Sequence, residues 1–535
     1  MDYPYMHSLY TLHRLSVEAG MRKEYLMASE ASGFSRPVSG VGSGAAIIAR
    51  QDRIPIWSLS YLFIGIIGVG FLFTFFDIFD INVSFIQTCT QIVAGCLPGL
   101  PPGATQLPRG LVLASDMIGL PTLLNLCGYV VGALILSPLA DRFGRRDMLL
   151  VTLIITGLGS LYTAFVGDYT NFVISRVITG IGVGADLALV ATYIGEVAPS
   201  TGRAKYTSLI FIMSSLGAFL GIWLGLILTT PAAPFPEGLP FAQATVQEVN
   251  KLPQFAGTGW RWMYGVGAIL ALIGIFLRFR LPESPRWLIT RGRIAEADEI
   301  VSDMEQRALK KLANLPPVGS EIHLNEGEKS ATYMEILGNP MYLRRTLLLF
   351  SMWFVAFMTV YTIGVGITTI LAGPGLNYPP STAGMITALG VFGFIACAIF
   401  DYGYSERLER KYWLPISAVL TIIGGLIIAL SGSANFWVTV IGAIILFIGF
   451  NLFVPMAWAW SAENYPTRAR ATGFALVDGI GHIGGGVGIL LIASNITTLG
   501  PVGTFLVIGG CLVVAAVIAQ FGTSTKEKRL DEVSP

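Results

Sequence analysis

The chain has 535 residues, of which 53% are hydrophobic and only 13% are charged, and its formal net charge is +1. Soluble proteins carry about 25% charged residues, so this apolar excess indicates a chain that lies in lipid rather than in water. No basic face interleaved with aromatic residues is present, which argues against a nucleic-acid partner.

Residues 1–54 are polar, of mixed charge, and lack the apolar stretch of a secretory signal peptide, so they are expected to form an N-terminal tail. Beyond them, apolar runs recur that are long enough to cross a bilayer core of about 30 Å, which takes about 20 helical residues. There are twelve such runs, at 57–86, 117–140, 148–166, 170–194, 206–230, 262–280, 346–371, 382–402, 412–431, 435–461, 471–494 and 503–521.

The sequence therefore predicts an all-α membrane protein with twelve transmembrane helices in two six-helix bundles, residues 55–280 and residues 344–522. A charged stretch at 281–343 is expected to be the linker between the bundles, and residues 523–535 a C-terminal tail. This charged stretch lies between the sixth and the seventh apolar run and so separates the two sets of six spans.

Lysine and arginine gather in the loops on the linker side of the predicted helices, whereas the opposite loops hold only Arg109, Lys251 and Arg261. Loops rich in Lys and Arg stay in the cytoplasm. The pattern predicts that the linker and both termini are cytoplasmic and that the protein resides in the plasma membrane.

Two motifs occur once in each predicted bundle. An acid-Arg-x-x-basic-basic motif follows the second and eighth spans, and a Glu-x-x-Pro-x-x-x-Arg motif ends the fourth and tenth; the residues are Asp141, Arg142, Arg145 and Arg146 with Glu196, Pro199 and Arg203, and Glu406, Arg407, Arg410 and Lys411 with Glu463, Pro466 and Arg470. The first acid and the glutamate are separated by 55 residues in one half and 57 in the other. A repeat of six and six helices predicts a substrate site at the midplane between the halves, with access alternating between the two sides.

Several segments resemble the major facilitator superfamily, and the resemblance covers the chain from about Arg50 onward. They are Ser137-Pro-Leu-Ala-Asp141-Arg142-Phe-Gly144-Arg145-Arg146, Arg176-x-x-x-Gly180-x-Gly182-x-Gly184 and Leu281-Pro-Glu283-Ser-Pro-Arg286-Trp287-Leu288, with Ser137 in place of the usual first glycine. The second and third are similar to signatures of the sugar-porter-like branch. The resemblance implies a secondary transporter that works without a cofactor.

The substrate markers of that superfamily point in different directions. Pro455-x-x-Trp458 resembles the sugar porters, where that tryptophan lines the sugar site, but their paired glutamines are absent from 352–370 and Phe211 replaces a helix-five glutamine. The segments around Glu463–Gly473 and Gly481-His482-Ile-Gly484 look like metabolite:proton and organic-ion transporters. The resemblance thus favours proton-coupled symport of a small polar metabolite, an organic acid or a sugar. It leaves open a sugar uniporter or a phosphate:proton symporter. Asp186 resembles the aspartate that phosphate:proton symporters carry on their fourth helix.

Acidic residues inside the predicted spans are candidates for proton coupling, because charges there are costly and are kept where they face a cavity or a partner. Asp77 and Asp80 lie three apart, on one helix face, and Arg176 lies at a depth similar to that of Asp80. We expect Asp80 to pair with Arg176 and to exchange a proton when the pair separates. Asp77 and Asp186 are further candidates; the alternatives are a static ion pair for Asp80, a helix-end residue for Asp77 and a structural hydrogen bond for Asp186.

Candidate substrate-binding residues lie on the seventh, tenth and eleventh spans. Asp478 and His482 are four apart and can touch, and histidine titrates near physiological pH; a packing pair is the alternative. Trp353, Tyr361 and Trp458 are aromatic residues that can stack on a substrate or simply pack.

The repeated motifs are expected to form salt bridges that hold an inner gate shut and break when it opens. The predicted gate residues are Asp141, Arg142, Glu196, Arg203, Glu406, Arg407, Glu463 and Arg470. A role as plain topology signals would account for the arginines but not for the repeated glutamates.

The chain contains no nucleophile–base constellation, metal-ligand spacing or phosphate-binding loop. It is therefore expected to be neither an enzyme nor an ATP-driven pump, to hold no metal, and to act as a monomer on a small-molecule substrate and a proton. Cys89 and Cys96 could form an external disulfide, although the favoured interpretation is that they are small packing residues in membrane helices.

Overall fold

The computed structural model describes residues 43–92, 115–199, 203–229, 259–318, 332–378, 380–432, 435–466, 469–526, 528 and 533, and these residues form helices and connecting segments without strands. Arg109, Lys251 and Arg468, which entered the loop charge pattern, lie outside them, as does Cys96. Residues Gly44–Pro535 belong to one unit, which contains the predicted bundles.

Twelve helices of the described residues are long and apolar enough to cross a membrane, which confirms the predicted spans. In the N-terminal half they are α3 with α4 (Tyr61–Phe79, Ile81–Ile92), α5 with η1 and α6 (Ser115–Val131, Gly132–Leu136, Ser137–Phe143), α7 (Arg145–Phe165), α8 (Tyr169–Val197), α9 (Arg203–Thr229) and α11 (Gly259–Arg278). In the C-terminal half they are α15 (Pro340–Gly364), α17 (Pro380–Tyr404), η2 with α18 (Arg410–Tyr412, Trp413–Ser431), α19 with α20 (Phe436–Asn451, Val454–Glu463), α21 with η5 and α22 (Arg470–Phe474, Ala475–Gly479, Ile483–Ser494) and α23 (Ile496–Gln520), with the short α16 (Ile367–Ala372) after α15.

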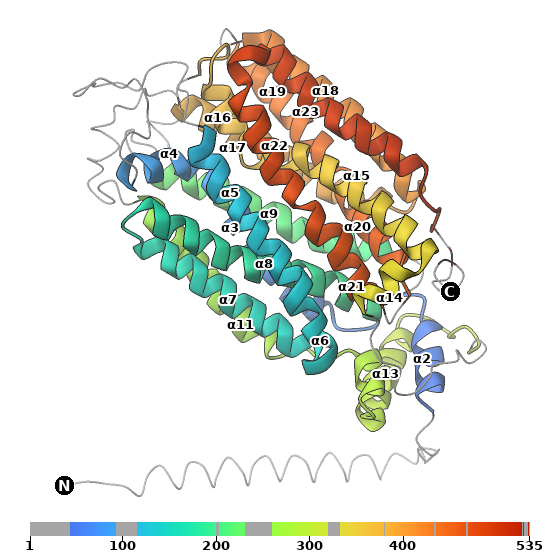
Figure 1. Cartoon of the computed structure of the whole chain (residues 1–535). Coiled ribbons are helices and arrows are strands. Elements are labelled where there is room, and N and C mark those ends of the chain that lie inside the picture. Colours follow the sequence, from blue (N-terminus) through green and yellow to red (C-terminus); the bar gives the residue numbers. More distant parts are fainter. Residues whose placement is uncertain are drawn as a thin grey trace, which may run out of the picture. The chain divides into compact units, whose positions relative to one another are not determined.

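The two halves meet along pairs of helices taken from each. Helix α9 packs along α17, and α5 packs along α22 (Figure 1). Glycines allow the backbones around this interface to approach closely. A Cβ atom at Gly184 of α8 would overlap the carbonyl oxygen of Tyr129 on α5, and one at Gly485 of α22 would overlap the ring of Tyr361 on α15. These glycines thereby fix the positions of two aromatic residues near the midplane.

The linker contains α12 (Pro285–Thr290), α13 (Ile294–Leu309) and α14 (Tyr333–Gly338). Helix α2 (Gly44–Asp52) lies beside α13 (Figure 1). Ile47 and Ile48 join the apolar cluster of α12 and α13, and Arg50 pairs with Asp298 at 2.5 Å and with Glu305 at 2.7 Å. The predicted tail therefore ends in a helix that is packed on the linker.

The helix ends next to the linker define what we call the linker end of the bundle, and the other ends define the opposite end. Helix α3 begins at the linker end, where the Nζ of Lys311 lies 4.7 Å from the ring centroid of Tyr61. Cys89, on α4, is disulfide-bonded, so its interpretation as an unpaired packing residue is wrong. Cys127, Cys397 and Cys511 are free thiols.

Candidate functional site

A cavity lies between the two halves, and aromatic side chains form most of its wall. The aromatic residues of the wall are Phe75, Phe79, Phe211, Phe357, Tyr361, Phe394, Phe450, Trp458 and His482. Besides Tyr361, Trp458 and His482, the wall has one polar side chain, Asn451. We call this space the central cavity; it can surround an apolar ring but offers few hydrogen-bond partners.

A second space extends towards the linker end, between Ile194 and Gly195 of α8 and Glu463 and Arg470 of the other half. Phe211 and Trp458 line both spaces. Their ring centroids are 5.3 Å apart at an interplanar angle of 89°, and the Phe71 centroid lies 5.6 Å from that of Trp458. These three rings form an aromatic partition between the central cavity and the linker-end cavity.

Asp478 lies behind the partition and joins the two halves. Its Oδ1 accepts a hydrogen bond from Trp458 Nε1 at 3.1 Å, and its Oδ2 accepts one from the Tyr129 hydroxyl at 2.7 Å. Tyr129 belongs to α5 of the N-terminal half and was not among the predicted site residues. Its only signal in the sequence is that it is a polar aromatic residue within a predicted span.

His482 forms one edge of the central cavity, and the predicted contact with Asp478 is present. Its Nδ1 lies 2.7 Å from the Asp478 carbonyl oxygen and 3.6 Å from the carboxylate. Because a carbonyl oxygen can only accept, Nδ1 carries the hydrogen and Nε2 of the neutral ring is an acceptor. The ring is held between Tyr129 and Phe357, each with its centroid 3.8 Å away.

The other two aromatic candidates differ in position. Tyr361 lines the central cavity, with its ring centroid 5.7 Å from that of His482. Trp353 is fully buried outside the cavity wall, where it stacks on Phe357 at 4.7 Å and donates to the Ser461 hydroxyl at 2.8 Å. The geometry gives Trp353 a packing role.

In this conformation Arg176 pairs with Asp77 rather than with Asp80. Its Nη2 lies 3.1 Å from Asp77 Oδ2 and donates to the Asp77 carbonyl oxygen at 2.8 Å, while Ser160 donates to Oδ1 at 2.5 Å. Asp77 thus offers the guanidinium both its side chain and its carbonyl. Asp80 is fully buried, and neither of its carboxyl oxygens has a hydrogen-bond partner among the described residues.

Asp186 forms a second buried ion pair, with Arg278 at the end of α11. Arg278 Nη2 lies 3.0 Å from Asp186 Oδ2, Thr152 donates to Oδ1 at 2.7 Å, and both charged side chains are fully buried. This arrangement matches the structural alternative for Asp186. Arg278 was not among the predicted site residues, although its position inside the apolar run 262–280 is a signal.

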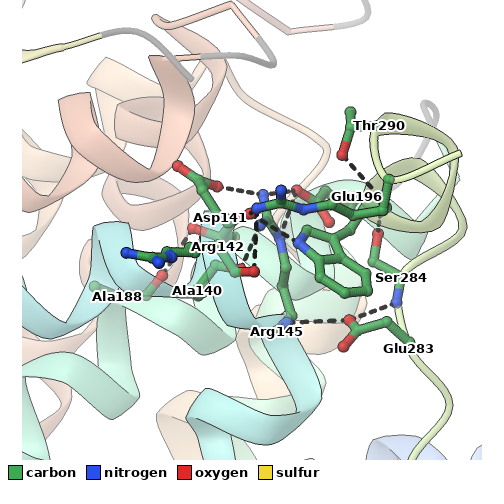
Figure 2. A network of polar contacts seen from close by, with 12 residues as sticks. Ala140, Asp141, Arg142, Arg145, Ala188, Glu196, Glu283, Ser284 and Thr290 are labelled. Carbon is green, nitrogen blue, oxygen red and sulfur yellow. Dashed lines mark hydrogen bonds and ion pairs between the residues drawn. The ribbon is translucent and has the colours of Figure 1, made fainter. Parts of the chain in front are cut away.

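The repeated motifs form one ion cluster in each half, but the arginines differ from those expected. In the N-terminal half Arg145 lies 2.7 Å from Asp141 and 3.0 Å from Glu196, whereas Arg142 is exposed and its side chain points away from them (Figure 2). Helix α6 ends at Phe143, and Gly144 with its φ of 108° separates it from α7, so Arg145 at the start of α7 reaches back to Asp141 across this turn.

The mirrored cluster repeats this geometry. Arg410 lies 2.8 Å from Glu406 and 3.4 Å from Glu463, while Arg407 sits over the Tyr404 ring with its Cζ 4.4 Å from the centroid. The prediction that Arg142 and Arg407 form these bridges is therefore wrong. In both halves the fourth residue after the acid makes the bridge.

Two contacts at the linker end cross between the halves. Glu406 Oε1 accepts hydrogen bonds from the backbone N–H groups of Ala204 at 3.0 Å and Lys205 at 3.3 Å, in the first turn of α9. Arg470 lies against α8, where a Cβ atom at Gly195 would be 3.5 Å from its Cδ. The side chain of Arg203 lies outside the described part of the structure.

Comparison with known proteins agrees with this architecture. Residues 113–535 match the family model described as "Sugar (and other) transporter". The chain is 27% identical to the putative metabolite transport protein YyaJ of Bacillus subtilis over 90% of its own length and 96% of the relative's. It is 29% identical to a D-xylose transporter of Levilactobacillus brevis over 65% of its own length and 71% of that relative's.

Among solved structures, the proton:xylose symporter XylE bound to 6-bromo-6-deoxy-D-glucose superposes with a TM-score of 0.63 and 20% identity. The match covers 88% of this chain and 98% of that one, which shows a shared fold. The family model covers most of this chain, and the described residues contain twelve helices long and apolar enough to cross a membrane. The chain therefore belongs to the sugar (and other) transporter family of the major facilitator superfamily, as an integral membrane transporter and not an enzyme.

Proposed function

We propose that this transporter is a proton-coupled symporter of a small organic metabolite, and the buried group of Asp77, Arg176 and Asp80 carries the proposal. An ionised carboxylate buried without hydrogen bonds is costly, so Asp80 holds a proton in this conformation. Arg176, on the neighbouring helix α8, stabilises the charge of Asp77 instead. A movement that brings the guanidinium to Asp80 would release that proton, which is the step that coupling needs.

The lining of the central cavity supports an organic acid with an apolar ring over a sugar. A sugar carries several hydroxyl groups that need partners, and a buried polar group left unpaired costs about 1–3 kcal/mol. The wall offers four polar side chains, and Trp458 already donates to Asp478. A ring would pack on Phe211, Phe357 and Phe394, and its carboxyl group, in the protonated form, would donate to Nε2 of His482.

The alternatives fit the cavity less well. Phosphate would require several donors or cations, and the described wall of the central cavity contains no lysine or arginine. A sugar uniporter would give Asp80 no proton-carrying function. Its buried carboxyl, which has no hydrogen-bond partner among the described residues, would then only destabilise the protein.

We further propose that the linker end faces the cytoplasm, following the lysine and arginine pattern, and that the protein acts as a monomer in the plasma membrane. One chain supplies the whole wall of the central cavity, so a second copy is not needed to complete it. Residues 1–54, 281–343 and 523–535 would then belong to the cytoplasmic side of the protein.

Two measurements on the purified full-length protein test these proposals. Benzoate, as a ring carboxylate, should raise the thermal unfolding midpoint because a ligand of the folded state stabilises it, whereas D-xylose should raise it less. In proteoliposomes, adding benzoate outside should make the external medium more alkaline, compared with protein-free vesicles. Stabilisation by D-xylose alone, with uptake but no proton movement, would instead identify a sugar uniporter.

A further inference from the structure

A second buried carboxyl lies in the C-terminal half, near the linker end of α17. Asp401 is fully buried, and its Oδ2 is 3.5 Å from the Cys397 thiol, which is a weak donor. Its Oδ1 has no hydrogen-bond partner among the described residues. Asp401 therefore resembles Asp80, and differs from Asp77 and Asp186, each of which has an arginine.

Among the described residues, no lysine or arginine forms an ion pair with Asp401. From α9, Lys205 lies over the Tyr402 ring, with its Nζ 5.2 Å from the centroid. From η2, Arg410 is held by Glu406 and Glu463 and reaches only the Ser405 carbonyl oxygen, at 3.5 Å. Helix α19, which packs along α17, has no charged residue. An ionised Asp401 would thus be a buried, unpaired charge, so in this conformation it is neutral and carries a proton.

Polar groups run from Asp401 in both directions along α17. Towards the cavity, Cys397 lies 3.6 Å from the Ile448 carbonyl oxygen, and Asn451 of the cavity wall follows Ile448 by three residues on the same face of α19. Towards the linker end, the Ser405 N–H donates to the Asp401 carbonyl oxygen at 2.8 Å, and the Ser405 hydroxyl is buried without a partner among the described residues. Buried polar groups are normally hydrogen-bonded, so this row is suited to bind water.

The two unpartnered carboxyls lie at different depths. Asp80 is 19 residues from Tyr61, at the linker-end start of α3, which is about 28 Å along a helix. Asp401 is three residues from Tyr404, at the linker-end terminus of α17, which is about 5 Å. Asp80 is therefore placed towards the opposite end, and Asp401 close to the linker end.

We propose that Asp401 is a second proton-binding carboxyl of the transport cycle, which exchanges its proton with water through the linker end. This inference rests on the proposed proton coupling and adds to it a site in the other half. In the exchange step the O–H bond of the Asp401 carboxyl breaks, the proton passes to water in the row past Ser405, and a carboxylate remains until a proton returns by the same route.

Infrared spectroscopy of the purified full-length protein in lipid tests whether Asp401 holds a proton. At neutral pH, Asp401→Asn should remove a C=O band of a protonated carboxylic acid, and Asp80→Asn should remove a different one. Cys397→Ser should shift the Asp401 band without removing it, because a hydroxyl is a stronger donor than a thiol, whereas Cys511→Ser in α23 should leave it unchanged. The Asn variant is isosteric and neutral, like the protonated acid, so it should fold.

The outcomes separate the two proposals. An unchanged band in Asp401→Asn would overturn this inference and leave the role of Asp80 standing, whereas loss of a band in Asp401→Asn but not in Asp80→Asn would count against Asp80. The route is tested in D2O: Ser405→Ala should slow the deuterium shift of the Asp401 band several-fold, and Asn451→Leu should not. The reverse pattern would connect Asp401 to the cavity and contradict exchange at the linker end.

Discussion

Replacing Glu406 by alanine should favour opening of the linker end. The Glu406 carboxylate contacts the first turn of α9 in the other half, through hydrogen bonds of 3.0 and 3.3 Å from Ala204 and Lys205. The contact places a negative charge at the N-terminus of α9 and adds two backbone hydrogen bonds. It joins the two halves of the transporter, which must separate at the linker end before the substrate can enter or leave there.

The size of the effect follows from this geometry. A carboxylate at a helix N-terminus contributes about 0.3–1 kcal/mol when exposed and up to about 2 kcal/mol when partly buried. The Glu406 side chain is 31% exposed, so solvent screening places the effect near 1 kcal/mol. We therefore expect roughly a fivefold shift in the ratio of open to closed linker ends.

The reaction rate of a cysteine at Ala462 reports this shift, because Ala462 lines the linker-end cavity. The free thiols Cys127, Cys397 and Cys511 are first replaced by serine. A water-soluble thiol reagent added from the linker side should then label position 462 about five times faster in Glu406→Ala than in the parent protein.

Glu409→Ala is the matched control. Its Oε1 also accepts backbone hydrogen bonds, from Thr525 at 3.1 Å and Lys526 at 3.4 Å, but both belong to its own half of the chain. It should leave the labelling rate unchanged. Equal rates for Glu406→Ala and the parent, or the same increase in both variants, would refute the assignment of Glu406 to the contact between the halves.

Three further predictions concern the buried ion pairs and His482. Asp186→Leu should destabilise the protein by about 3–5 kcal/mol because Arg278 is left buried and unpaired, and adding Arg278→Met should restore most of the thermal unfolding midpoint. Arg145→Met should lower that midpoint, whereas Arg142→Met, which removes an exposed side chain, should change stability by less than about 0.5 kcal/mol. His482→Leu should abolish the benzoate-induced thermal shift and His482→Gln should retain part of it, since glutamine can still form a hydrogen bond; equal shifts would exclude His482 as a ligand contact.

The helices could be predicted because length and apolar composition decide which segments cross a membrane, but their ends depend on local geometry. Helix α15 begins at Pro340 rather than 346, because the Asn339 side chain accepts from the N–H groups of Met341 and Tyr342 ahead of the apolar run. Helix α23 begins at Ile496 rather than 503 and is kinked at Gly500, whose φ is 63°. Composition alone contains neither the cap nor the kink.

The depth of the site residues was also predictable, but their partners were not. Asp77 and Asp80 share a helix face, and only the reach of Arg176 in three dimensions decides that it binds Asp77. The bond from Tyr129 to Asp478 joins residues that are 349 positions apart, and no local pattern indicates it. The Asp141–Arg145 bridge depends on the turn at Gly144, whose φ is 108° and which separates α6 from α7, so the spacing of residues along one helix does not indicate it.

The most direct test of proton coupling is Asp80→Asn in proteoliposomes loaded with the ligand that the thermal-shift screen identifies. Asparagine mimics the protonated carboxyl permanently, so the variant should still exchange labelled ligand across the membrane. It should lose accumulation driven by a pH gradient, and with it the external alkalinisation. A variant that still accumulates ligand when a pH gradient is imposed would contradict the assignment of Asp80 as the coupling residue.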